Sequence, residues 1–133
     1  MMLKYAMNKL IRHKLIPRMH DEGVVVNYKT LSDEEYIAKL FNKLEEETEE
    51  AKQETDKDKL AIELADVLEV VLAIASAHEI DISKIETERL KKREINGTFN
   101  PSTYVKYIEV AKDNHKVIKY LADQNKPYIF EEI

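Results

Sequence analysis

The segment from about Lys57 to Ala77 constrains the fold most, because it is apolar on nearly every side of a helix. Leucine, valine and isoleucine recur at helical spacing along one stripe, and more apolar residues cover much of the remaining surface. A helix of this kind is buried, either in the centre of a bundle or against a second subunit. Only two glycines and three prolines occur in 133 residues, which favours a few long helices over many strands.

Composition narrows the class of protein. Charged residues make up 35% and hydrophobic residues 44%, which is typical of a single globular domain with a charged exterior. No cysteine is present, which excludes disulfides and thiolate metal sites and is compatible with the cytoplasm. We find no secretory signal in MMLKYAMNKLIRHK and no stretch long enough to span a membrane. The net charge of −5 argues against nucleic-acid binding.

A first long helix is predicted to begin after Ser32, which forms a capping box with Glu35. Leu31 and Tyr36 have the spacing of a hydrophobic staple. The apolar stripe that follows then meets a carboxylate on its buried side. Its members are Ile37, Leu40, Leu44, Glu47 and Ala51.

The rest of the chain is expected to complete one all-α domain, 1–133. Its parts are an irregular N-terminal segment (1–31), a core (32–99) and a C-terminal helical extension (100–133). A short helix is expected to end near Pro17, followed by a loop with room for a short strand at 24–26.

Two further helical regions are predicted after the apolar helix. One begins at a second capping box, Ser83 to Glu86, and ends near Glu94. The other begins near Pro101, with Tyr104, Ile108 and Ala111 on one side, and Val117, Ile118 and Leu121 follow in a continuation or a fifth helix.

Carboxylates occur at helical spacing on both long helices. Glu47 and Glu50 are three residues apart on the first, beside Glu46, and Glu63 and Asp66 are three apart on the second. In an antiparallel hairpin these carboxylates converge into a cage of oxygens, which suits Mg²⁺ or Mn²⁺ rather than zinc. Because Mg²⁺ is usually bound together with phosphates, the cage implies a phosphorylated ligand.

Simpler roles for these acidic residues stay open. Taken alone, the run Glu45–Glu50 is typical of a solvated helix face, with Lys43 and Lys52 to offset its charge. Salt bridges could account for Glu63 and Asp66, and the residues that could form them are Lys9, Arg12 and Lys92. A ferritin-like di-iron site is disfavoured, because no glutamate has a histidine three residues later.

The acidic pattern resembles the signature of the all-α nucleoside triphosphate pyrophosphohydrolases, the MazG-like superfamily. That signature is Glu-Glu-x-x-Glu, a spacer, then Glu-x-x-Asp. In this chain it is 46-EETEE-50, twelve residues, then 63-ELAD-66. The resemblance implies a helical hairpin or four-helix bundle, here with an extra C-terminal helical region.

Sequences around the motif resemble the phosphoribosyl-ATP pyrophosphohydrolase-like branch of this superfamily. The opening KLIRHKLIP (9–17) and the segment KKREINGTF (91–99) resemble two of its conserved blocks, and the motif helices resemble two more. The chain departs from the branch at His13, where aspartate is usual, and at Thr98, where glycine is usual.

The resemblance implies hydrolysis of a nucleotide to its monophosphate and pyrophosphate. It assigns Mg²⁺ to Glu47, Glu50, Glu63 and Asp66, and a catalytic role to Glu46 and Glu47. The side chains expected to neutralise phosphates are Arg12, Lys14, Lys91 and Arg93. It also implies a homodimer or homotetramer. The alternative is a non-catalytic helical interaction protein.

Overall fold

A computed structural model gives the structure of residues 1–124. This part of the chain is all-α, as predicted, and contains no strand. Its helices are α1 (Leu15–Asp21), α2 (Asp33–Gln53), α3 (Lys57–Ala77), α4 (Ile82–Asn96) and α5 (His115–Asp123). The chain forms two compact units, Met1–Ile95 and Asn96–Ile133, and the boundary lies close to the predicted start of the C-terminal part.

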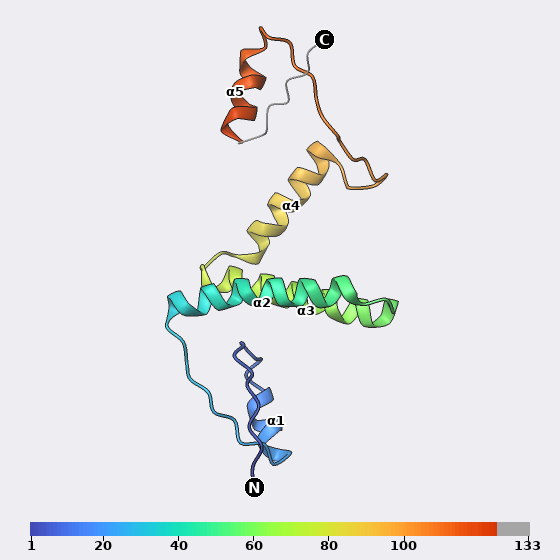
Figure 1. The fold of residues 1–133 in the computed structure, drawn as a ribbon. Helices are drawn as coiled ribbons and strands as arrows, with labels where there is room; N and C mark the ends of the chain where they lie inside the picture. Colours follow the sequence, from blue (N-terminus) through green and yellow to red (C-terminus); the bar gives the residue numbers. More distant parts are fainter. Residues whose placement is uncertain (125–133) are drawn as a thin grey trace. The chain divides into compact units, whose positions relative to one another are not determined.

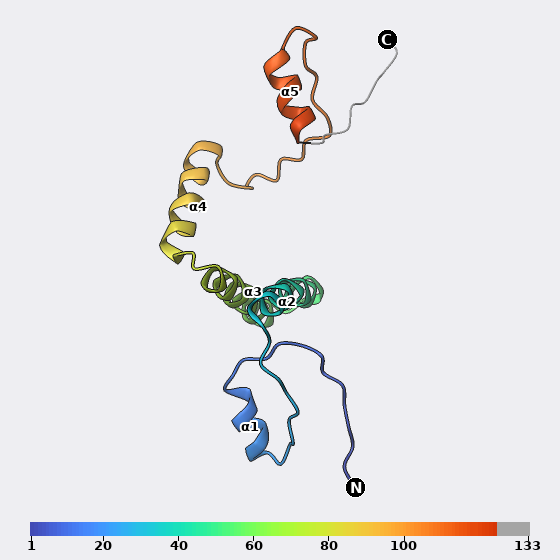
Figure 2. The same cartoon turned by 90° about the vertical axis from the view of Figure 1, so that its left-hand side faces the viewer.

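Helices α2 and α3 lie side by side as a hairpin, and in the described residues they are the only two helices that pack together (Figures 1 and 2). The predicted cap of α2 is confirmed, because the Ser32 hydroxyl oxygen accepts the backbone N–H of Glu35 at 3.3 Å. Asp56 caps α3 by accepting the N–H groups of Asp58 and Lys59 at 2.9 and 3.1 Å. The two caps fix where the hairpin helices begin.

The buried residues of the hairpin are few. Leu40 of α2 and Val70 and Ala75 of α3 are the buried apolar residues in the described part of the chain, and Glu47 is buried as well. The predicted stripe on α2 is confirmed. Within the described residues α3 is not buried on all sides, because Leu64 is 54% exposed. Among the described helices it has one neighbour, α2, which covers one side of it. Burial against a second subunit, the other predicted arrangement, stays a prediction.

The N-terminal segment differs from the prediction. Residues 1–14 contain no helix, and α1 begins at Leu15 and continues through Pro17 instead of ending before it. Proline is tolerated here because the N–H groups of a helix's first turn have no partner within the helix. No strand forms at 24–26.

Helix α4 begins one residue before the predicted cap. Asp81, not Ser83, supplies the capping carboxylate, and its Oδ1 accepts the Ser83 N–H at 2.9 Å. Glu86 pairs with Arg89 instead of closing a capping box. Among the described residues, no helix is both long enough and apolar enough to cross a membrane.

The C-terminal unit confirms only the later of its two predicted helical segments. Helix α5 contains Val117, Ile118 and Leu121, and Asn114 caps it by accepting the Val117 N–H at 3.3 Å. Residues 103–110 form no helix, contrary to the prediction from Pro101. This segment is rich in β-branched and aromatic residues, which have lower helix propensity. Residues 125–133 of the predicted extension lie outside the described part.

Candidate metal centre

Glu47 lies on the apolar stripe of α2, so helical periodicity turns its carboxylate toward α3. The residue is only 7% exposed. Its Oε1 lies 3.3 Å from Nζ of Lys43, one turn earlier on the helix. Its Oε2 is buried and has no hydrogen-bond partner in the described structure. A buried carboxylate oxygen without a hydrogen-bond donor lowers the stability of the fold, so the burial of this oxygen requires a physical explanation.

Glu63 and Asp66 occupy the facing side of α3, and both are half-buried. Glu63 repeats the property of Glu47, because its Oε2 is buried and has no hydrogen-bond partner among the described residues. The two helices therefore direct unpartnered oxygens into the same part of the hairpin. Neither oxygen is satisfied by the ordinary means of capping or salt bridging.

Two groups of carboxylates could each hold a metal ion, and they share Glu47. One group is Glu46, Glu47 and Glu50, and the other is Glu47, Glu63 and Asp66; in each, one oxygen per residue lies within 4.8 Å of the others. Oxygens that share one Mg²⁺ lie about 3.0 to 4.2 Å apart, since each Mg–O distance is about 2.1 Å. The 4.8 Å limit is slightly above this range, so carboxylates at this spacing are compatible with the ion.

Charge and burial act on the Glu47 carboxyl together. Burial raises its pKa above the ordinary value, the charge of Glu50 acts in the same direction, and the hydrogen bond from Lys43 opposes both. Burial lowers the pKa of Lys43, but bonds to Glu47 and the nearby charge of Glu46 outweigh it and raise the pKa overall. Lys43 thus stays charged beside a carboxylate whose ionisation is opposed.

Two cations from the N-terminal segment reach the same carboxylates. Arg12 Nη2 lies 2.8 Å from Asp66 Oδ1, and Lys9 Nζ lies 3.5 Å from Glu46 Oε1. A salt bridge therefore accounts for Asp66, through Arg12 as the sequence allowed. It does not account for Glu47 and Glu63, whose orphan oxygens remain. The Lys9 contact joins residues far apart in sequence, and no local spacing indicates it.

The acidic run divides into two kinds of residue. Glu45, Glu49 and Glu50 are exposed, and Glu49 Oε1 accepts a bond from the Gln53 amide at 3.0 Å. A solvated face thus describes Glu45 and Glu49 well. Glu46 is half-buried and Glu47 is buried, so the inner edge of the run belongs to the carboxylate cluster.

The other predicted phosphate-binding residues form no contact with the carboxylate cluster in the described part of the chain. Lys14, Lys91 and Arg93 are exposed and form no ion pair within residues 1–124. Arg12 is the one that the structure brings to the carboxylates. The phosphate role of the other three stays a prediction.

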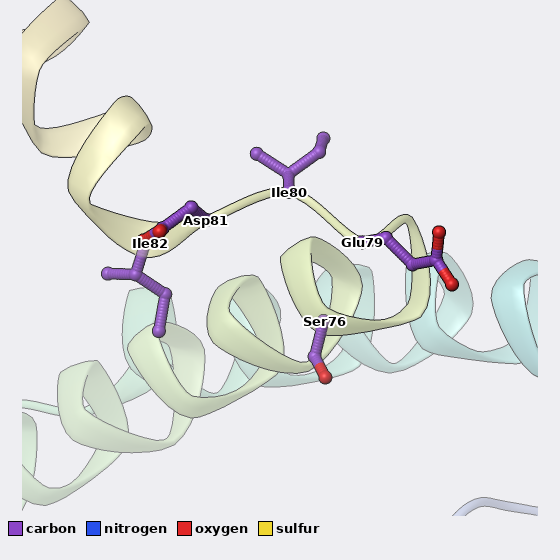
Figure 3. A pocket seen from close by; sticks show the side chains of 5 residues that line it. All are labelled: Ser76, Glu79, Ile80, Asp81 and Ile82. Carbon is purple, nitrogen blue, oxygen red and sulfur yellow. The ribbon is translucent and has the colours of Figure 1, made fainter.

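Two hollows on the surface lie away from the carboxylate cluster. One, of about 410 Å³, is open and lies at the turn between α3 and α4. Figure 3 shows that its side chains point in different directions, with Ile80 and Glu79 turned away from Ser76. A second hollow of about 350 Å³ includes Tyr36, which is eleven residues before Glu47, or about 16 Å along the helix. Neither hollow has the convergent polar groups of a binding site.

Comparisons with known proteins give no relative. No family model matches the chain, and no curated protein and no solved structure is significantly similar to it. The resemblance to pyrophosphohydrolases therefore rests on the sequence motifs alone.

Proposed function

We propose that this chain is a Mg²⁺-dependent nucleotide pyrophosphohydrolase, with Mn²⁺ as the alternative ion. The observation that carries the proposal is the pair of buried, unpartnered oxygens on Glu47 and Glu63, within one cluster of carboxylates. Each such oxygen costs about 1–3 kcal/mol when it has no partner. A divalent cation would satisfy both. The motif resemblance supplies the substrate class, a nucleoside triphosphate or a nucleotide like phosphoribosyl-ATP.

In this proposal four carboxylates, those of Glu47, Glu50, Glu63 and Asp66, hold the ion. When bound, Mg²⁺ would supply positive charge and Lewis acidity at the phosphates. Glu46 would orient the attacking water and accept its proton. Its Oε1 faces Lys9 and Lys43, so Oε2 is the oxygen left for this role.

The reaction exchanges one bond for another at the α-phosphorus. The water oxygen bonds to that phosphorus, and the bond from it to the oxygen that bridges to the β-phosphorus breaks. Pyrophosphate leaves, and the nucleoside monophosphate keeps the water oxygen. Arg12 supports the proposal by its place beside the cluster, where its guanidinium can bind phosphate oxygens. Lys14, Lys91 and Arg93 would assist from the surface.

The proposal includes a homodimer or homotetramer, in which a second hairpin would complete a four-helix bundle. Its support is the exposed apolar surface of α3, where Ile62 is 62% and Leu68 is 58% exposed. Burying a side chain of this size contributes about 1.5–3 kcal/mol. The mass in solution, measured by light scattering, would contradict this part if it were that of one chain. We place the enzyme in the cytoplasm.

Pyrophosphate release from a panel of nucleoside triphosphates and phosphoribosyl-ATP tests the proposal. We expect release with Mg²⁺, none with a chelator, and none from Glu47→Gln. Glu49→Gln is the matched control, because its carboxylate is exposed two residues away. Absence of release from every nucleotide, with no effect of Mg²⁺ on melting temperature, would sink the enzyme hypothesis.

A non-catalytic interaction protein is the second candidate. The same exposed apolar residues of α3 favour it, because unpaired apolar surface marks interaction sites. Such a protein would be indifferent to Mg²⁺, so the experiment above separates the two candidates.

A further inference from the structure

The N-terminal arm, residues 1–14, reaches the carboxylate cluster through two ion pairs. These are Arg12 with Asp66 at 2.8 Å and Lys9 with Glu46 at 3.5 Å. Both partners on the hairpin belong to the groups of carboxylates that could hold a metal ion. The arm and a divalent cation therefore depend on the same side chains.

The charges indicate how the arm affects such an ion. The cluster has five carboxylates, namely Glu46, Glu47, Glu50, Glu63 and Asp66. Lys43 on α2 offsets one, and Lys9 and Arg12 offset two more, so five minus three leaves two negative charges. Without the arm, five minus one leaves four. Release of the arm thus doubles the charge that attracts a cation.

The arm is attached weakly. No residue of the arm is buried, and the side chain of Arg12 is 61% exposed. Ion pairs in this setting stabilise little, because water and salt screen them. The guanidinium can therefore leave Asp66 at small cost. A phosphate would receive it well, since arginine binds phosphate oxygens in a bidentate manner.

We propose that the N-terminal arm competes with divalent cations for Asp66 and Glu46, and transfers Arg12 and Lys9 to the phosphates when a cation and nucleotide bind. This inference rests on the proposed function and adds its regulation. The arm offsets part of the negative charge of the acidic cluster until the substrate brings its own negative charge.

Calorimetric titration of the full chain with Mg²⁺ tests the competition, without any measurement of activity. We expect Arg12→Gln to bind Mg²⁺ about threefold to fivefold more tightly than the wild type, the scale of an exposed ion pair. Inorganic tripolyphosphate, titrated in the presence of Mg²⁺, should bind Arg12→Gln more weakly. Arg18→Gln is the matched control, because Arg18 is exposed in α1, directly after the arm, and forms no ion pair with a described residue.

The outcomes are distinguishable. Weaker or unchanged Mg²⁺ binding by Arg12→Gln would overturn the competition, and weaker binding would make Arg12 a residue that positions Asp66. In that case, loss of Mg²⁺ binding in Glu47→Gln would still uphold the proposed metal site. Absence of Mg²⁺ binding in both the wild type and Arg12→Gln would overturn the metal site and the inference together.

Discussion

The side of α2 that faces α3 and the side that faces solvent both carry glutamates, but in different surroundings. Glu47 is 7% exposed and has an oxygen without a partner. Glu49, two residues later, is exposed and accepts a bond from Gln53. The difference follows from the helical period, which places residue 47 on the apolar stripe and residue 49 away from it.

Helix α3 repeats this contrast. Glu63 is half-buried with an orphan oxygen, whereas Glu69 is exposed to solvent. We call Glu47 and Glu63 the inner carboxylates, and Glu49 and Glu69 the outer carboxylates. The contrast between them shows that a local density of acidic residues does not locate a site. The position of each acid relative to the apolar stripe does.

The largest expected difference between inner and outer carboxylates is in activity. We expect Glu63→Gln to lower kcat/KM for the nucleotide substrate by about 100-fold or more. Loss of a group that only hydrogen-bonds to a metal ligand already lowers metal affinity or activity by about 10–100-fold. Glu69→Gln should change it little. Steady-state kinetics at saturating Mg²⁺ measures both. Equal effects of the two substitutions would remove the distinction between inner and outer carboxylates.

A smaller difference is expected in stabilisation by the ion. Mg²⁺ at about 100 times its dissociation constant should stabilise the wild type by about 2.7 kcal/mol, because it binds only the folded chain. Glu47→Gln should lose this gain, and Glu49→Gln should keep it. Thermal unfolding with and without Mg²⁺ gives the values. A gain retained by Glu47→Gln would remove Glu47 from the ligand set.

The sequence predicted the hairpin well, since its signals are local. The cap at Ser32 and the apolar stripe of α2, which includes Glu47, depend on residues close in sequence. The bounds predicted for the apolar helix, Lys57 to Ala77, are those of α3. Helical periodicity determines which residues share a face, and this was enough to predict that the carboxylates of each helix lie on the same side of it.

What the sequence could not predict depends on which segment covers which face. The apolar helix was expected to be buried in a bundle or against a second subunit, and periodicity does not choose between them. Among the described helices α3 has a single neighbour, which leaves Leu64 54% exposed. The contact of Lys9 with Glu46 joins residues distant in sequence, where no spacing rule applies. The segment after Pro101 was predicted helical from one proline and three spaced apolar residues, against the low helix propensity of its other residues.

The smallest expected difference concerns the chain without metal. Burial raises the pKa of Glu47 in the folded state, so the folded chain holds this proton at a pH where the unfolded chain has lost it. Below the ordinary value of 4.5, both states are protonated and burial has no ionic cost. As pH rises above that value the folded state loses stability, until the carboxyl is ionised in both states. At neutral pH, in a chelator, Glu47→Gln should therefore be more stable than the wild type.

Denaturant unfolding of Glu47→Gln across pH 4 to 7 checks this effect. The difference from the wild type should shrink toward zero as pH falls toward 4.5, and Glu49→Gln should show no such trend. If Glu47→Gln is instead less stable at neutral pH, the ion pair with Lys43 outweighs the burial of the carboxylate. Glu47 would then be a structural acid whose charge the fold supports. Its unpartnered oxygen would then no longer be evidence for a bound cation.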